Sequence, residues 1–142
     1  MTLNELVNLF KQLAIDHKQI NSFGFGVNSE LDISNKVYPQ MYVEIEPIAL
    51  NGKDVTIPFS FIFSDRVTKD LRNETDVISD MMSVSLDIRA LLMSPTYFDS
   101  FAVDISGTIT PFRDSTDDET AGVILDLGIK ITDLKDRCQV PL

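Results

Sequence analysis

The chain has 142 residues, of which 44% are apolar and 24% charged, proportions that are ordinary for one globular domain. Twenty-two acidic residues against twelve basic ones give a net charge of −10, and the basic residues are scattered along the sequence. Because binding to a nucleic-acid backbone or an anionic membrane requires clustered Lys and Arg, this composition argues against both as specific partners.

A single cysteine, Cys138, rules out an intrachain disulfide and a multi-cysteine zinc site, and it suits a reducing compartment. The N-terminal segment has no basic region and no cleavage site, so we expect no signal peptide. No run approaches 18 apolar residues, so we expect no membrane span. These observations predict one soluble domain, residues 1–142, made in the cytoplasm.

The first expected element is a helix from about Leu3 to Lys18. Thr2 is its expected N-cap, and Glu5 three residues later completes a capping box. Apolar residues follow at helical spacing and form one stripe. Next, "SFGFGV" alternates Phe23 and Phe25 with small residues, which indicates a half-buried strand.

Two further strands are expected around a hairpin. "VYPQMYVEIEP" alternates, and it places Glu44 and Glu46 on the same side of one strand. "LNGKD" contains Asn-Gly, a strong hairpin signal, and the returning strand is "VTIPFSFIFS". Since Pro58 in that strand cannot donate a backbone hydrogen bond, we expect an edge or a bulge there.

The second expected helix runs from about Thr75 to Met93, and Pro95 prevents its continuation. Its main apolar stripe, which Ile78 and Leu92 widen, consists of Val77, Met81, Val84, Ile88 and Leu91. Three more apolar residues lie off this stripe: Met82, Leu86 and Met93. A helix that is apolar on more than one side is either deeply buried or shared with a neighbouring subunit.

Two long strands are expected to close the chain, "FDSFAVDISGTITPF" and "AGVILDLGIKIT". In the first of them Phe101, Val103 and Ile105 alternate with less apolar residues, which places the three on one face. The order helix, hairpin, helix, strand, strand indicates an α+β fold. We expect an antiparallel (mixed) sheet with the two helices packed on one face.

The sequence most suggestive of chemistry is the acidic cluster before the last strand, which contains Asp114, Asp117, Asp118 and Glu119. Its glycine comes three residues too late for a calcium loop of the EF type, and Leu125 stands at the position where glutamate is required. We therefore interpret the cluster as a solvated loop, with a weak adventitious cation site as the alternative.

Few residues could serve a catalytic centre. His17 is the only histidine; its nearby carboxylate in the sequence is Asp16, and its place near a helix C-terminus is stabilising in its own right. Cys138 lies in the tail beside Arg137, a poor setting for a nucleophile. Glu44 and Glu46 would suit a glycosidase pair only inside a cleft, and nothing in the sequence marks one. We expect no catalytic residue, no cofactor and no metal.

The chain resembles a group of phage proteins. "FIFSDRVTKDLRNETDVISDMMSVSLDIRALLM" resembles a pattern in structural proteins from viruses of Bacteroidetes-type hosts, in which a strand leads through a "DR…D…N" loop into a helix. "LFKQLAIDHKQINSFGFG" and "DDETAGVILDLGIKITDLKDRCQVPL" resemble the same group, so the resemblance covers most of the chain. More broadly, the order of elements is similar to that of tail-terminator and neck-ring proteins of tailed phages.

This resemblance implies a virion protein that forms a ring of six or twelve copies at the portal–tail junction, in contact with portal, neck or tail proteins. DNA would pass through an acidic lumen that repels its backbone. The candidate subunit-interface or lumen positions are Glu44, Glu46, Met82, Leu86, Met93, Asp114, Asp117, Asp118 and Glu119.

Two other functions stay open. An acidic accessory module, such as an assembly chaperone or an inhibitor of a basic host protein, would use the negative charge to bind a basic partner. A small hydrolase is the third reading, and it would require a cleft with convergent carboxylates.

Overall fold

The computed structural model describes residues 2–26, 37–67, 73–97, 99–114, 119–132 and 141. The helices are α1 (Leu3–Asp16), α2 (Glu74–Leu92) and the short 3-10 helix η2 (Pro95–Tyr97). The strands are β1 (Ser22–Gly26), β2 (Gln40–Ile45), β3 (Ala49–Asn51), β4 (Asp54–Arg66), β5 (Ala102–Val103), β6 (Thr108–Asp114) and β7 (Thr120–Thr132).

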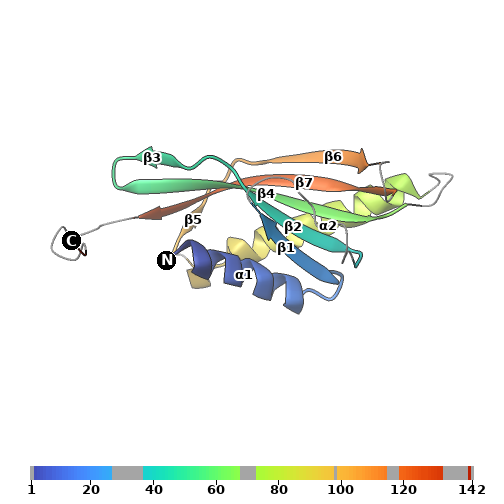
Figure 1. Cartoon of the computed structure of the whole chain (residues 1–142), viewed down its shortest axis with the longest axis horizontal. Coiled ribbons are helices and arrows are strands. Elements are labelled where there is room, and N and C mark those ends of the chain that lie inside the picture. Colours follow the sequence, from blue (N-terminus) through green and yellow to red (C-terminus); the bar gives the residue numbers. More distant parts are fainter. Residues whose placement is uncertain are drawn as a thin grey trace.

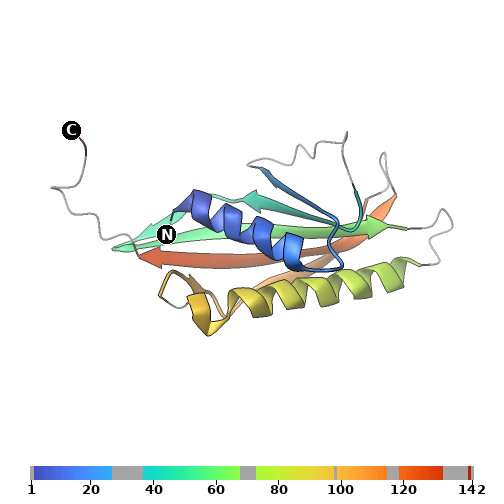
Figure 2. The ribbon, with the colours of Figure 1, turned by 90° about the horizontal axis from the view of Figure 1, so that it is seen from below.

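The strands form one mixed sheet of seven, and α1 and α2 lie side by side against one of its faces (Figure 1, Figure 2). The order across the sheet is β1-β2-β4-β7-β5, while β3 pairs with β4 and β6 pairs with β7. The predicted α+β fold is therefore confirmed. The opposite sheet face, called the outer face below, carries neither of these two helices.

Helix α1 begins at the predicted capping box. The Thr2 hydroxyl accepts a hydrogen bond from the Glu5 amide at 3.2 Å, and the Glu5 carboxylate accepts one from the Thr2 amide at 2.6 Å. The helix ends at Asp16, slightly earlier than predicted, because His17 adopts extended backbone angles as the C-cap. Its buried residues are Leu6, Phe10, Leu13 and Ala14.

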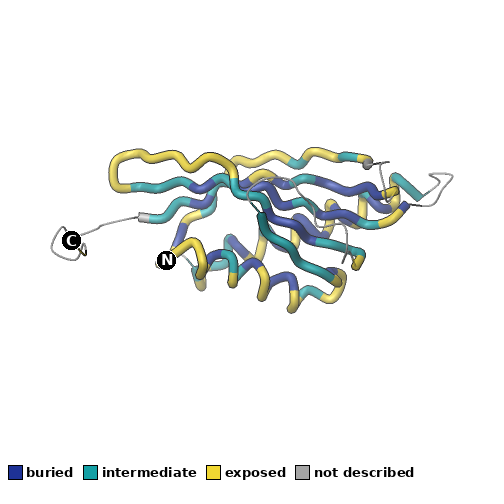
Figure 3. Tube along the Cα trace, in the orientation of Figure 1, coloured by how far each residue is buried: buried dark blue, intermediate teal, exposed yellow. Residues whose placement is uncertain are grey.

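The core lies between the helices and the sheet, where the buried residues of β2, β4 and β7 gather (Figure 3). At its centre, the Phe10 ring meets the rings of Phe59 and Phe61 edge-on, with centroids 5.0 and 5.1 Å away. Edge-to-face pairs of this kind add about 0.5–1.5 kcal/mol each beyond the burial of apolar area. This packing fixes which side of β4 faces inward.

The pairing of β1 with β2 is parallel, whereas every other strand pair is antiparallel. A purely antiparallel sheet is therefore not what forms, and the mixed alternative is correct. Thirteen residues separate Gly26 from Gln40. That length matches the dozen or more residues that a parallel crossover needs.

Strands β3 and β4 form the predicted hairpin. Asn51 lies opposite Asp54, so Gly52 and Lys53 make a two-residue loop. Gly52 has a φ of +63°, a conformation that glycine adopts without a steric cost. The hairpin lies at the end of β4 that pairs with the C-terminal end of β7 (Figure 1).

Pro58 lies inside a central strand, and the β4–β7 register runs past it without the bulge expected from the sequence. Its carbonyl oxygen accepts a hydrogen bond from the Glu46 amide at 3.0 Å. In a strand, the nitrogen and carbonyl of one residue point to the same side. The missing N–H of Pro58 therefore points to the side of β4 that faces β2 and β3. Pro58 lies in the gap between these two strands, so β4 has a short local edge there.

Helix α2 buries Val77, Met81, Val84 and Ile88 as predicted, but not Leu91. Leu91 is 44% exposed, and Leu92 occupies the inner face in its place. The predicted spacing of four and three residues drifts around a straight helix of 3.6 residues per turn. Leu92, four residues after Ile88, therefore faces the core more directly than Leu91, three residues after it.

The segment expected to be one long strand is two strands, β5 and β6, both paired with β7. Four residues separate Val103 from Thr108, while only two separate their partners on β7, Ile129 and Asp126. The extra residues form a bulge, and they leave Ile105 83% exposed where the alternation predicted an inward side chain.

Candidate functional site

A row of polar residues crosses the outer face of the sheet. Glu44 on β2 lies opposite Ser60 on β4, and Ser60 lies opposite Asp126 on β7. Asp126 in turn lies opposite Thr108 on β6. Because directly paired residues of adjacent strands project to the same face, one row of side chains joins four strands. Glu46, two positions after Glu44, lies beside this row.

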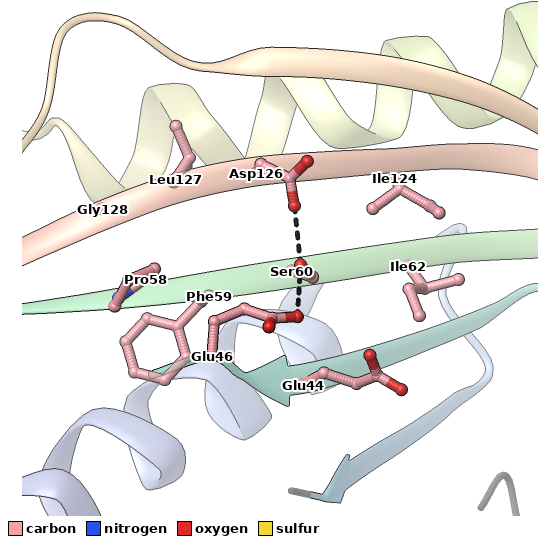
Figure 4. Close-up of a pocket in the computed structure, with 10 residues that line it drawn as sticks. All are labelled: Glu44, Glu46, Pro58, Phe59, Ser60, Ile62, Ile124, Asp126, Leu127 and Gly128. Atoms are coloured by element: carbon pink, nitrogen blue, oxygen red, sulfur yellow. Dashed lines mark hydrogen bonds between the residues drawn. The ribbon is translucent and has the colours of Figure 1, made fainter. Parts of the chain in front are cut away.

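Hydrogen bonds connect most of this row. The Ser60 hydroxyl donates to Asp126 Oδ1 at 2.6 Å, and Glu46 Oε1 lies 3.4 Å from the same hydroxyl oxygen (Figure 4). Thr108 Oγ1 donates to Asp126 Oδ2 at 3.3 Å. A hydroxyl has one proton, so Ser60 serves Asp126 much better than Glu46. Asp126 thus has a donor at each oxygen, while the two glutamates do not.

The row borders an open hollow of about 560 Å³ on the outer face (Figure 4). Ile62 and Ile124, both half-buried, supply apolar surface at one end, and Pro58 and Gly128 lie at the other. Three carboxylates line the hollow, and none of the other described residues around it is a Lys, Arg or His. The hollow therefore combines an apolar wall with uncompensated negative charge.

Glu44 is the most perturbed carboxyl of the hollow. Partial burial raises its pKa first, and the neighbouring charge of Glu46 raises that pKa further. Its Oε1 atom is buried and has no hydrogen-bond partner within the described part of the chain. Burial and the charge of Glu44 also raise the pKa of Tyr42 on the same strand. An unpaired buried acceptor is costly, so an incoming N–H donor would be stabilised here.

The geometry of the hollow does not fit the two functions that carboxylates most often serve, acid–base catalysis and metal binding. A carboxyl with a raised pKa beside a second carboxylate is a known acid–base pattern, but glycosidase pairs flank the bond that breaks. Glu44 and Glu46 project from one strand into an open hollow, on the same side of any molecule bound there. Among the described residues, no group of three His, Cys, Asp or Glu is placed to hold a metal ion. The arrangement is suited to accepting N–H donors or a cationic side chain.

Several of the predicted positions are brought together and others are not. Glu44 and Glu46 share the hollow, which nothing in the sequence marked because strand register, invisible in the sequence, builds it. Met82 and Leu86 share an exposed side of α2, whereas Met93 is half-buried at the helix C-cap.

The acidic loop is described only at its two ends. Asp114 closes β6, while Asp117 and Asp118 lie outside the described residues. Glu119 is exposed, and its carbonyl oxygen accepts a hydrogen bond from the Val67 amide at 3.0 Å. This bond ties the residue before β7 to the residue after β4. The interpretation of the cluster as a solvated loop stays a prediction.

His17 has a partner that the sequence does not reveal. Its Nε2 atom lies 3.0 Å from the carboxylate of Asp87 on α2, whereas the sequence pointed to Asp16. The Gln19 amide donates to His17 Nδ1, which leaves the proton on Nε2, facing Asp87. The contact links the end of α1 to α2, so the residue has a structural role.

The sequence reasoning missed Ser60, Thr108 and Asp126. Two of them have a readable signal, because "FSF" and "LDL" each place one polar residue between two buried apolar residues of a long strand. Such a residue must project from the outer face. What the sequence withholds is the register that aligns them.

No family model matches this chain, and a search of curated proteins returns no match. Within the part of the chain that the structure describes, neither helix has the length and apolar character needed to cross a membrane.

Proposed function

We propose that this chain is a structural subunit of a phage virion that assembles into a ring of six or twelve copies at the portal–tail junction. The proposal starts from the sequence resemblance described above. Its physical support is a surface that a solitary domain of this size would not need, on the side of α2 that faces away from the core.

The single observation that carries the proposal is the second apolar side of α2. Met82 and Leu86 are 46% and 41% exposed, and their spacing of four residues places them together on the helix. Arg89, one turn further, donates a 3.1 Å hydrogen bond to the carbonyl oxygen of Ile105, whose side chain is exposed. Exposed apolar side chains grouped in this way are typical of protein–protein contacts.

The edge beside this helix is also suited to controlled assembly. Strand β6 pairs with β7 from Thr108 to Asp114, so its other side is an edge of the sheet, and Pro111 lies in the middle of that edge. Proline has no N–H, so β6 is a poor template for adding another strand. Side-chain contacts through α2 would then determine which subunits meet.

The test is copy number together with mass. Purified particles should contain the chain at a fixed multiple of six, measured by quantitative mass spectrometry against the portal protein. Light scattering should give a mass six or twelve times that of one 15.9 kDa chain, either alone or on purified portal or tail complexes. A chain that is absent from particles and stays monomeric beside those complexes is not a ring component.

The acidic hollow favours a second candidate, an accessory module that binds a basic partner. Its three carboxylates, with no cation among the described lining residues, would attract a cationic segment. This candidate predicts that the chain is present in infected cells but absent from finished particles, which is the opposite result for copy number.

A further inference from the structure

The tip of the β3–β4 hairpin, residues 48–53 and called the arm tip below, is a second exposed surface. Leu50 is 79% exposed, and Ile48 beside it is 48% exposed. Lys53 is also exposed and forms no ion pair with any described residue. Figure 3 shows the whole tip as exposed chain at one end of the molecule. The tip therefore presents an apolar side chain and a cation together.

The hollow offers the complementary pair of features. Its apolar wall of Ile62 and Ile124 is half-buried, and the described residues that line it include carboxylates but no cation. Glu44 contributes a buried oxygen with no donor among the described residues. A ligand with one ammonium group and one aliphatic side chain would satisfy both parts of the site.

The arm tip of the same molecule cannot reach its own hollow. Strand β4 is extended from Asp54 to Arg66, and Ser60 lies six residues beyond Asp54. At about 3.3 Å per residue this separation is roughly 20 Å. That distance exceeds the reach of a lysine side chain, so Lys53 can enter the hollow only from another molecule.

We infer that the arm tip of one copy docks in the acidic hollow of a second copy, with Lys53 paired to Glu44 and Glu46 and Leu50 against the isoleucines. The two surfaces are different patches of one chain, so the contact is heterologous and can close into a ring. The inference rests on the proposed ring function and names a second contact between its subunits, in addition to the contact through α2.

A charge swap tests the contact. Lys53→Glu should weaken self-association at least about tenfold, because it places like charges together, and Glu46→Lys should do the same. The double variant, with Lys53→Glu and Glu46→Lys, reverses the pair and should restore association. Lys18→Glu, which makes the same change of charge at an exposed position at the end of α1, should associate like the unchanged chain. Light scattering across a concentration series measures all four.

A second experiment locates the contact directly. A photo-crosslinking residue in place of Leu50 should join neighbouring copies at peptides from β2, β4 or β7, identified by mass spectrometry. Crosslinks to other segments, or a Lys53→Glu variant that associates normally, would overturn the arm contact and leave the ring proposal standing. If the double variant associates again but the chain is absent from virions, the contact is supported and the virion role is overturned. An unchanged chain that stays at 15.9 kDa at every concentration overturns the contact.

Discussion

The Ser60 hydroxyl donates a 2.6 Å hydrogen bond to Asp126 Oδ1, joining the outer faces of β4 and β7. These two strands are paired over their whole length, from Asp54 opposite Thr132 to Arg66 opposite Thr120. The bond lies near the middle of this pair, on the face that the helices leave open. It holds the Asp126 carboxylate in place at the wall of the hollow.

Ser60→Ala should lower the free energy of unfolding by about 1 kcal/mol. A hydrogen bond to a charged group contributes about 1.5–3 kcal/mol, and the exposure of Asp126 reduces that value. Thr108→Val, which removes the longer 3.3 Å bond to the same carboxylate, should cost less. Urea unfolding of both variants measures the difference. Equal losses in the free energy of unfolding would mean that the short Ser60–Asp126 bond stabilises the protein no more than the long one.

The periodicity of the sequence was sufficient to predict most of the individual elements. Thr2 and Glu5 define the start of α1, Asn51-Gly52 defines the hairpin, and the alternation in β7 identifies its buried face. Each of these signals lies within a few residues of the feature it specifies, so it can be read without knowing the fold.

The candidate site could be predicted only in part, because it depends on contacts between distant segments. Glu44 and Glu46 were recognised as neighbours on one strand, but Asp126 meets them only through the registers of two strand pairs. His17 likewise finds Asp87 seventy positions away. Local alternation also failed at Ile105, because a bulge changes the face of a strand without changing its composition.

Glu44→Gln should stabilise the protein near neutral pH. The folded state raises the pKa of Glu44 above the ordinary value of 4.5, by burial and by the Glu46 charge. The folded state therefore prefers the protonated form. The stability that this carboxyl contributes is complete below the unfolded pKa and is lost as pH rises through the folded pKa. The glutamine variant avoids that loss, so its advantage should vanish below about pH 4.5.

The matched variant is Glu46→Gln, which removes the second cause of the shift while leaving the burial of Glu44. NMR titration of the Glu44 carboxyl should show its pKa moving down toward the ordinary value in that variant. Finding that Glu44 titrates at or below 4.5 in the unchanged protein would contradict both expectations.

Gly122→Ala should be strongly destabilising. A Cβ atom on Gly122 would overlap the backbone carbonyl oxygen of Phe63 on β4, so the two strands would have to separate. The expected cost is about 3 kcal/mol or more. Gly128→Ala on the same strand is the control, since its Cβ would lie 2.6 Å from a carboxylate oxygen of Asp104, an exposed side chain that can move. Thermal unfolding should separate the two variants clearly, and comparable losses would disprove the explanation.

Leu86→Lys should prevent assembly while leaving the single chain folded. Leu86 is 41% exposed, and substitutions at such positions usually change stability by no more than about 0.5 kcal/mol. A charge there would have to be buried by any subunit that packs on this side of α2, which is unfavourable. Light scattering measures assembly, and urea unfolding measures stability.

Leu91→Lys provides the matched control on the same helix. Leu91 is 44% exposed, and five residues at 100° each place it well around the helix from Leu86. It should therefore leave assembly intact. Met81→Lys, at a buried position, should unfold the chain, which shows what a core substitution looks like in the same assays. If Leu91→Lys abolishes the oligomer and Leu86→Lys does not, then subunits meet on the flank of α2 that carries Asp87, and the proposed interface is on the wrong side.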